Sequence, residues 1–140
     1  MTRITPRGAG VSNQGIVERA YEHFAAGEIP QVLDLLAEDV RWTESEGSFN
    51  GGTYTGGQAV LENVFARLGA EWEGFEPRPD AVVADGDQVV VRGWYTGTHR
   101  TTGRSFRARF VHWWTVRDGR LATFEQVCDT AVMGAALPSA

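Results

Sequence analysis

The stretch 104–129, with the sequence RSFRARFVHWWTVRDGRLATFEQVCD, decides the fold of this chain. From Phe106 to Trp114 every second residue is apolar apart from His112, whereas the residues between them are mixed. This alternation is typical of a strand with one buried face. Asp118-Gly119 then fits a short hairpin turn, after which the alternation resumes. The stretch therefore predicts two antiparallel strands, at about 104–117 and 120–129.

The same pattern extends upstream of this stretch. Two more strands are expected at about 74–84 and 88–99, connected by Asp85-Gly86-Asp87, and Thr101-Thr102-Gly103 supplies the next turn. Connections this short join strands that lie side by side and run in opposite directions. The second half of the chain is therefore expected to form an antiparallel meander.

The first half of the chain has apolar residues at helical spacing instead. Helices are expected at about 16–26, 30–36 and 59–68, the first of them ended by Gly27. A short strand over Val40–Glu44 separates the second helix from the third. Helices followed by a sheet indicate the α+β class, with the helices packed on one face of the sheet.

The remaining segments define the domain organisation. Residues 1–14 have no apolar run of the kind found in secretory signals and are expected to be a flexible leader. The glycine-rich stretch 47–57 lacks the lysine of a phosphate-binding loop and is interpreted as a flexible rim or lid. No linker or internal repeat divides the rest, so residues 15–137 are expected to form a single domain.

The composition excludes several classes of function. The chain has 140 residues, 42% of them hydrophobic, and a net charge of -5, which argues against nucleic acid or a membrane as a partner. All 13 basic residues are arginines, so a Schiff-base lysine is excluded. Cys128 is the only cysteine, and the 3 histidines are scattered, which allows no internal disulfide and gives no metal-ligand spacing. We expect a soluble, cytoplasmic protein with no cofactor and no metal.

Strand parity indicates where a pocket would lie. His112 is the polar exception on the apolar face of its strand, and Glu44 shares a face with Trp42. Gly93, on the same face as Tyr95, leaves room for a bulge or a ligand. A curved sheet with helices across its mouth would enclose a largely aromatic cavity with few polar groups, the makeup of a small-molecule site. The residues expected to contact the ligand are Tyr21, Phe24, Trp42, Tyr95, Phe110, Trp114, Phe124, Gln126 and Cys128.

The opposite face of the 104–117 strand is amphipathic. It carries Val111 and Trp113, with Arg107 and Arg109 close by in the sequence. An apolar patch rimmed by arginines predicts a homodimer surface, and the alternative is a sheet face partly covered by the chain's own ends.

Several short motifs, in this order along the chain, resemble those of the nuclear transport factor 2-like superfamily. They are Ala26-Gly27-Glu28, Leu36-Ala37-Glu38-Asp39-Val40, Gly52-Thr53-Tyr54-Thr55-Gly56, Thr102-Gly103-Arg104, Arg117-Asp118-Gly119-Arg120-Leu121 and Asp129-Thr130. The resemblance covers about 16–137. The superfamily includes ketosteroid isomerases, limonene epoxide hydrolases and SnoaL-like polyketide cyclases. The resemblance implies a cystatin-like, cone-shaped α+β barrel, in which a curved, mainly antiparallel sheet and three N-terminal helices close an apolar pocket. It also implies a homodimer.

The resemblance to ketosteroid isomerases implies roles for individual residues. It places Glu44 at the position of their general base and His112 at the position of an oxyanion donor. The position of their donor tyrosine falls on Ala20, and the adjacent Tyr21 is expected to be turned away by one residue.

The other two groups imply different residues. The catalytic positions of limonene epoxide hydrolases fall on Gly93, Tyr95 and Gln126, so their mechanism is excluded. The final segment resembles the SnoaL-like cyclases, in which a carboxylate near this end acts as a base with a histidine nearby. Asp129 and His112 would fill those roles, although strand parity places Asp129 on the face away from the pocket.

Each catalytic candidate has a structural alternative. Glu44 is either a base whose pKa is raised by an apolar pocket or a solvated charge in a loop. His112 is either an enolate donor or base with a lowered pKa, or a core histidine. Asp129 is either a base or a cap that binds backbone amides at a strand end. His23 and His99 are expected to be exposed.

The sequence thus predicts a small, cofactor-independent enzyme that acts on an apolar carbonyl compound, polyketide-like or terpenoid-like. The reaction would be proton abstraction with stabilisation of an enolate, and His112, Glu44 and Asp129 are the catalytic candidates. The alternatives are a non-catalytic protein that binds a small hydrophobic ligand and a dimeric interaction module of the same fold.

Overall fold

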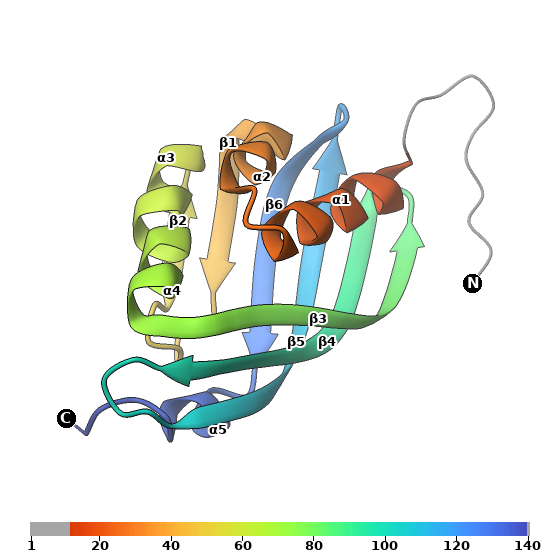
Figure 1. Ribbon diagram of the computed structural model, residues 1–140. Coiled ribbons are helices and arrows are strands. Elements are labelled where there is room, and N and C mark those ends of the chain that lie inside the picture. Colours follow the sequence, from red (N-terminus) through yellow and green to blue (C-terminus); the bar gives the residue numbers. More distant parts are fainter. Residues whose placement is uncertain (1–11, 140) are drawn as a thin grey trace.

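A computed structural model describes residues 12–139 of the protein (Figure 1). The chain begins with α1 (Asn13–Ala25) and α2 (Ile29–Leu35), followed by β1 (Leu36–Glu44) and β2 (Gly52–Thr55). A continuous helical segment comes next, made of α3 (Gly57–Val60), the π-helical turn η1 (Leu61–Phe65) and α4 (Ala66–Glu71). The long strands β3 (Trp72–Asp85), β4 (Gln88–His99), β5 (Ser105–Arg117) and β6 (Arg120–Cys128) then precede α5 (Thr130–Gly134).

The strands form one curved, six-stranded sheet in the order β2-β1-β6-β5-β4-β3. Neighbours are antiparallel except β1 and β6, which run parallel and are connected through the helical segment and the meander. The α+β class and the curved, mainly antiparallel sheet are confirmed. The sheet is not closed, because β2 and β3 are its two edges and do not pair with each other.

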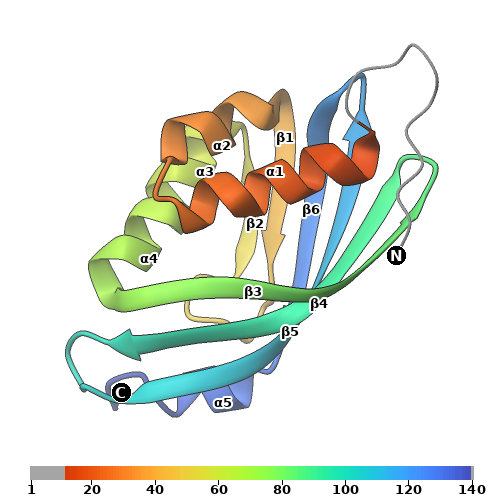
Figure 2. The same cartoon turned by 45° about the vertical axis from the view of Figure 1, so that its right-hand side comes forward.

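Helices cover the concave face of the sheet (Figures 1 and 2). The helix α1 lies across β3, β4 and β6, while α3 contacts β1 and β2 and α4 contacts β3. Ile16, Val17 and Ala20 form the buried side of α1. This arrangement leaves the inner face of β4, β5 and β6 directly beneath the helices, where a pocket was expected.

The ends of α1 follow from its sequence. The Ser12 side chain accepts a hydrogen bond from the Gly15 amide at 3.0 Å, which caps the first turn. After the helix, Gly27 has a φ of +74°, a left-handed conformation that glycine adopts without strain. The predicted leader 1–14 therefore overlaps the start of α1, and its residues 1–11 lie outside the described part of the chain.

The glycine-rich stretch contains a strand that the sequence did not predict. Gly52–Thr55 pairs antiparallel with the end of β1, with Trp42 opposite Tyr54 and Glu44 opposite Gly52. Tyr54 also donates a hydrogen bond to the Asn50 carbonyl at 2.8 Å. The interpretation of 47–57 as a flexible rim or lid is therefore wrong for Gly52–Thr55, which instead fixes the end of β1.

Gly93 lies opposite an irregularity in the pairing of β3 with β4. The pairing of β3 with β4 shifts register between Pro79 and Ala81, next to Gly93. A Cβ atom at Gly93 would lie 2.3 Å from the Arg78 carbonyl oxygen and 2.6 Å from the Phe110 ring. Of the two alternatives for this glycine, the structure shows the bulge, and the space beside it is filled by Phe110.

The convex face of the sheet is uncovered within residues 12–139. Trp113 is 51% exposed and Val127 is 61% exposed. The guanidinium group of Arg107 stacks on the Trp94 ring at 3.6 Å from its centroid, and that of Arg109 at 4.6 Å. The described ends of the chain thus leave Trp113 and Val127 open. In the same part of the chain, no helix has the length and apolar character needed to cross a membrane.

Candidate functional site

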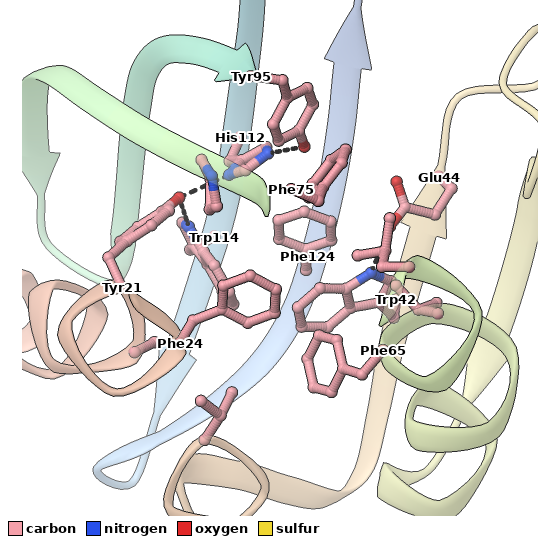
Figure 3. A pocket seen from close by; sticks show the side chains of 15 residues that line it. Tyr21, Phe24, Trp42, Glu44, Phe65, Phe75, Tyr95, His112, Trp114 and Phe124 are labelled. Carbon is pink, nitrogen blue, oxygen red and sulfur yellow. Dashed lines mark hydrogen bonds between the residues drawn. The ribbon is translucent and has the colours of Figure 1, made fainter. Parts of the chain in front are cut away.

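A largely aromatic cavity lies between the concave face of the sheet and the helices (Figure 3). Its volume is about 60 Å³. That is room for a few waters or one small ring compound. Glu44 and His112 lie in its wall among residues 12–139. The phenylalanines, tyrosines and tryptophans of the wall are Tyr21, Phe24, Trp42, Phe65, Phe75, Tyr95, Trp114 and Phe124.

His112 lies at the centre of the cavity floor, as strand parity predicted. Its Nδ1 is 2.6 Å from the Tyr21 hydroxyl, and its Nε2 is hydrogen bonded to the Tyr95 hydroxyl. The imidazole also stacks on Phe110, with ring centroids 4.0 Å apart. Burial lowers the pKa of His112 well below its usual value, so the ring is neutral at physiological pH. Each ring nitrogen of the neutral imidazole is thus hydrogen bonded to one tyrosine hydroxyl.

Both tyrosines are held by a second hydrogen bond. The indole N–H of Trp114 donates to the Tyr21 hydroxyl at 2.9 Å, and the side-chain amide of Gln126 donates to the Tyr95 hydroxyl at 2.8 Å. Burial raises the pKa of Tyr21 and of Tyr95 well above the ordinary value, and the charge of Glu44 raises that of Tyr95 further. Both phenols consequently keep their protons.

Glu44 is buried, at 4% exposure, at the end of β1. Its Oε1 accepts a hydrogen bond from the Trp42 indole at 3.0 Å, while Oε2 has no hydrogen-bond partner in the described chain. Burial raises the pKa of Glu44 to about 7, and the hydrogen bond from Trp42, which lowers the pKa, offsets only part of this rise. Of the two alternatives for this residue, the structure shows the buried carboxyl rather than the loop charge.

The register of the sheet relates Glu44 to His112. Thr43 pairs with Glu125, which brings Glu44 to the level of Gln126, and Gln126 pairs with His112. Strands in a sheet are about 4.8 Å apart, so the backbones of Glu44 and His112 are separated by roughly 10 Å. Gln126 lies between them and binds the Tyr95 hydroxyl. Glu44 on β1, Tyr95 on β4 and Tyr21 on α1 thus line one cavity from different elements.

Four predicted site residues lie outside the cavity wall. Phe110 packs behind Tyr95 and His112, and Gln126 acts through the Tyr95 hydroxyl. Cys128 is half-buried, and burial raises the pKa of its thiol to about 11, which leaves it uncharged. Asp129 is exposed, and its Oδ1 accepts the Val132 amide at 3.1 Å as the cap of α5. The capping alternative for Asp129 is therefore the one observed.

Of the two expectations for Tyr21, the structure shows the ligand contact and not the turn away from Ala20, while the exposure expected for His99 is wrong. Tyr21 faces the cavity together with Ala20, because successive residues of a helix differ by only about 100° and the inward stripe of a helix is at least that wide. His99 is buried at 4% exposure, since it pairs with Trp72 across β3 and β4 and its ring lies 4.8 Å from the Trp72 ring. His23 remains near the surface, with Nδ1 3.1 Å from a Glu28 carboxylate oxygen.

The sequence reasoning missed two aromatic residues of the wall, Phe65 and Phe75. Phe65 belongs to the apolar stripe of the third predicted helix, and the π-helical turn in front of α4 sets its direction. Phe75 lies near the start of β3, and its contact with the cavity depends on the curvature of the sheet. Only the helical spacing of Phe65 offered a signal. Among residues 12–139, no three His, Cys, Asp or Glu side chains gather as metal ligands would.

Comparison with solved structures gives close relatives of this fold. An NTF2-like protein from Burkholderia thailandensis is 35% identical, with a TM-score of 0.90 over 93% of this chain and 100% of that chain. TerC, crystallised with polyporic acid, is 28% identical, with a TM-score of 0.80 over 89% of this chain and 96% of its own. A candidate polyketide cyclase from Xanthomonas campestris is 23% identical, with a TM-score of 0.79 over 89% and 98%, and shares the fold alone.

Family membership follows from a different comparison. Among proteins with curated functions, none matches this chain significantly. The model of the SnoaL-like domain matches residues 17–124, which include α1 from Val17 onward, the helical segment and β6 as far as Phe124. That range covers most of the chain and nearly all of the cavity wall. This chain therefore belongs to the SnoaL-like family of NTF2-like proteins.

Proposed function

We propose that this protein moves a proton at the carbon next to a carbonyl group in a small apolar compound, through an enolate and without a cofactor. The observation that carries the proposal is the Oε2 atom of Glu44, which is buried on the cavity wall and has no hydrogen-bond partner in residues 12–139. A carboxyl whose pKa is near 7 is partly ionised at neutral pH, so it can accept a proton and return it.

The tyrosine hydroxyls at the other end of the space support the second half of the reaction. Removing the proton next to a carbonyl places negative charge on the carbonyl oxygen, and an O–H donor fixed beside that oxygen stabilises the charge. One of the hydroxyls of Tyr21 and Tyr95 can supply such a donor, and the neutral ring of His112 holds both hydroxyls in place. An apolar, water-poor cavity strengthens these interactions.

The wall of the cavity supports an uncharged, apolar substrate. Among residues 12–139, Glu44 contributes the only carboxyl group to it, and no arginine lines it. A polyketide-like or terpenoid-like carbonyl compound has the required character, and TerC was crystallised with polyporic acid. In a cyclase the enolate would attack a second carbonyl, whereas in an isomerase the proton would be returned elsewhere. Both outcomes begin with the step assigned to Glu44.

The test is deuterium exchange into 2-tetralone, an apolar ring ketone, in heavy water, followed by NMR. We expect the wild-type protein to accelerate exchange next to the carbonyl over buffer. Glu44→Gln should lower the rate by about 100-fold to 10,000-fold, the usual contribution of a general base. Glu46→Gln is the matched control, because Glu46 lies two residues away and is exposed. Binding of the ketone without any accelerated exchange would contradict the proposal and favour the non-catalytic ligand-binding alternative.

A further inference from the structure

We propose that His112 is a tautomeric switch that presents one tyrosine hydroxyl proton, that of Tyr95, to the oxygen atom of the bound compound. This inference deepens the proposed function and rests on it for the chemical class of the ligand. It makes His112 a positioning residue and Tyr95 the residue that contacts the ligand oxygen.

The argument begins with a count of polar hydrogens. Tyr21, His112 and Tyr95 together carry three of them, two O–H and one N–H, because the imidazole is neutral. A neutral imidazole has one donor nitrogen and one acceptor nitrogen. Since each ring nitrogen is bonded to one tyrosine, one tyrosine must donate to the ring and the other must accept from it. The accepting tyrosine keeps an O–H that neither bond uses.

The groups around the tyrosines cannot use this spare hydrogen. Trp114 meets Tyr21 with its indole N–H, which can only donate. Gln126 meets Tyr95 with its amide nitrogen, because its carbonyl oxygen already accepts the Ser45 amide at 3.2 Å. Both phenol oxygens are therefore acceptors on that side. In either tautomer, the network offers one O–H to whatever occupies the cavity.

Burial decides which tyrosine keeps the spare hydrogen in the empty protein. Tyr95 is 4% exposed, and an unused hydroxyl there would be stranded among aromatic rings at a cost of about 1–3 kcal/mol. The Tyr21 hydroxyl is buried too, but its side chain as a whole is half-buried and lines both the cavity and a wide outer groove between α1 and β3, so a spare hydrogen costs less there. The favoured arrangement has Tyr95 donating to Nε2 and the ring donating from Nδ1 to Tyr21.

A ligand oxygen beside Tyr95 reverses this arrangement. Gln126, which lies level with Glu44 across β1 and β6, binds the Tyr95 hydroxyl, so an oxygen placed beside Tyr95 leaves the adjacent carbon toward Glu44. The Tyr95 O–H then donates to the ligand, Nε2–H donates to Tyr95, and Tyr21 donates to Nδ1. Tyr95 passes its proton to Nε2, Nδ1 releases its proton to water, and water returns a proton to the Tyr95 oxygen, so the ring stays neutral and the three residues keep the same number of protons.

The direct test is nitrogen NMR of wild-type protein with labelled histidine, using 4-nitrophenol as the probe and nitrobenzene as its matched control without the hydroxyl. We expect Nε2 of His112 to give the signal of an unprotonated nitrogen in the free protein. On saturation with 4-nitrophenol, Nε2 should become protonated and Nδ1 unprotonated, and nitrobenzene should cause no exchange. An unchanged tautomer in the complex, or no preference for 4-nitrophenol over nitrobenzene, would overturn the proposal.

Two matched variants assign the donor. Tyr95→Phe should weaken binding of 4-nitrophenol by on the order of 10-fold to 100-fold while nitrobenzene binding changes little, as expected for a lost bond to a charged oxygen. Tyr21→Phe should cost only a few-fold, since Tyr95 can still donate. Equal losses in both variants contradict the assignment. A tautomer exchange in a protein that does not accelerate deuterium exchange would overturn the proposed function and leave this inference standing.

Discussion

The indole of Trp42 donates to one oxygen of the Glu44 carboxyl, at 3.0 Å, from the same face of the same strand. The two side chains are neighbours because residues two apart in a strand point the same way. This bond fixes the carboxyl, whose second oxygen has no hydrogen-bond partner in residues 12–139 and whose residue lines the cavity. The proposed chemistry follows from this carboxyl, which is held in an apolar wall by a hydrogen bond to one of its two oxygens.

The raised pKa of Glu44 predicts a pH-dependent cost to stability. Its pKa rises from 4.5 in the unfolded chain to about 7 in the folded protein, so the folded form is favoured below the first value and loses that advantage as pH rises through the second. Relative to Glu44→Gln, the wild-type free energy of unfolding should fall by about 3 kcal/mol between about pH 4 and pH 8. Urea unfolding of both proteins measures this difference, and parallel pH curves would contradict it.

Removal of the His112 ring predicts losses in both stability and binding. His112→Ala opens a cavity beside Phe110 and takes away the partner of two buried hydroxyls, which should lower the free energy of unfolding by about 2–4 kcal/mol. The variant should also bind 4-nitrophenol no better than nitrobenzene. His23→Ala, near the surface, is the control and should change stability by less than about 0.5 kcal/mol. Loss of stability with intact preference for 4-nitrophenol would mean a purely structural histidine.

Gly93 and Gly69 form a matched pair of glycines. A methyl group at Gly93 would collide with the Arg78 backbone, so Gly93→Ala should destabilise the protein by more than about 2 kcal/mol. Gly69 lies exposed in α4 with nothing within 4 Å of its added Cβ, so Gly69→Ala should be neutral or stabilise by up to about 1 kcal/mol. Thermal unfolding of both variants decides the matter, and equal melting temperatures would show that the bulge tolerates a side chain.

The open convex face leads us to propose a homodimer that buries Trp113 and Val127. These side chains are 51% and 61% exposed in the single chain. Light scattering should give about twice the 15.3 kDa of one chain, and Trp113→Glu should reduce the mass to that of a monomer. Val83→Glu is the control, because Val83 is 66% exposed on β3, the edge strand far from β6. A monomeric wild-type protein at micromolar concentration would contradict the proposal.

Sequence alternation predicted best which face of the sheet a side chain in the middle of a long strand occupies. His112 lies in the middle of a long strand, where an error of two residues in the boundary cannot change its face, and its position was correct. Glu44 ends its strand, so its burial depended on the pairing of Gly52–Thr55, which a glycine-rich sequence does not reveal.

The remaining errors arise from packing between distant segments. Tyr21 was expected among the ligand contacts and yet turned away from Ala20, because the width of the inward stripe of α1 depends on how the helix crosses the sheet. His99 was expected at the surface because it is next to a turn, but Trp72, at the start of β3, covers it. The sheet also curves without pairing its edge strands β2 and β3, and no local sequence pattern indicates how far it curves.

The pH profile of deuterium exchange into 2-tetralone tests the central claim, that the Glu44 carboxylate is the base. The rate with wild-type protein should rise as the carboxyl ionises and level off above about pH 7, following the pKa of Glu44. Glu44→Gln should remove this rise, and Glu46→Gln should retain it. A Glu44→Gln protein that exchanges the ketone at the wild-type rate across this pH range would contradict the account.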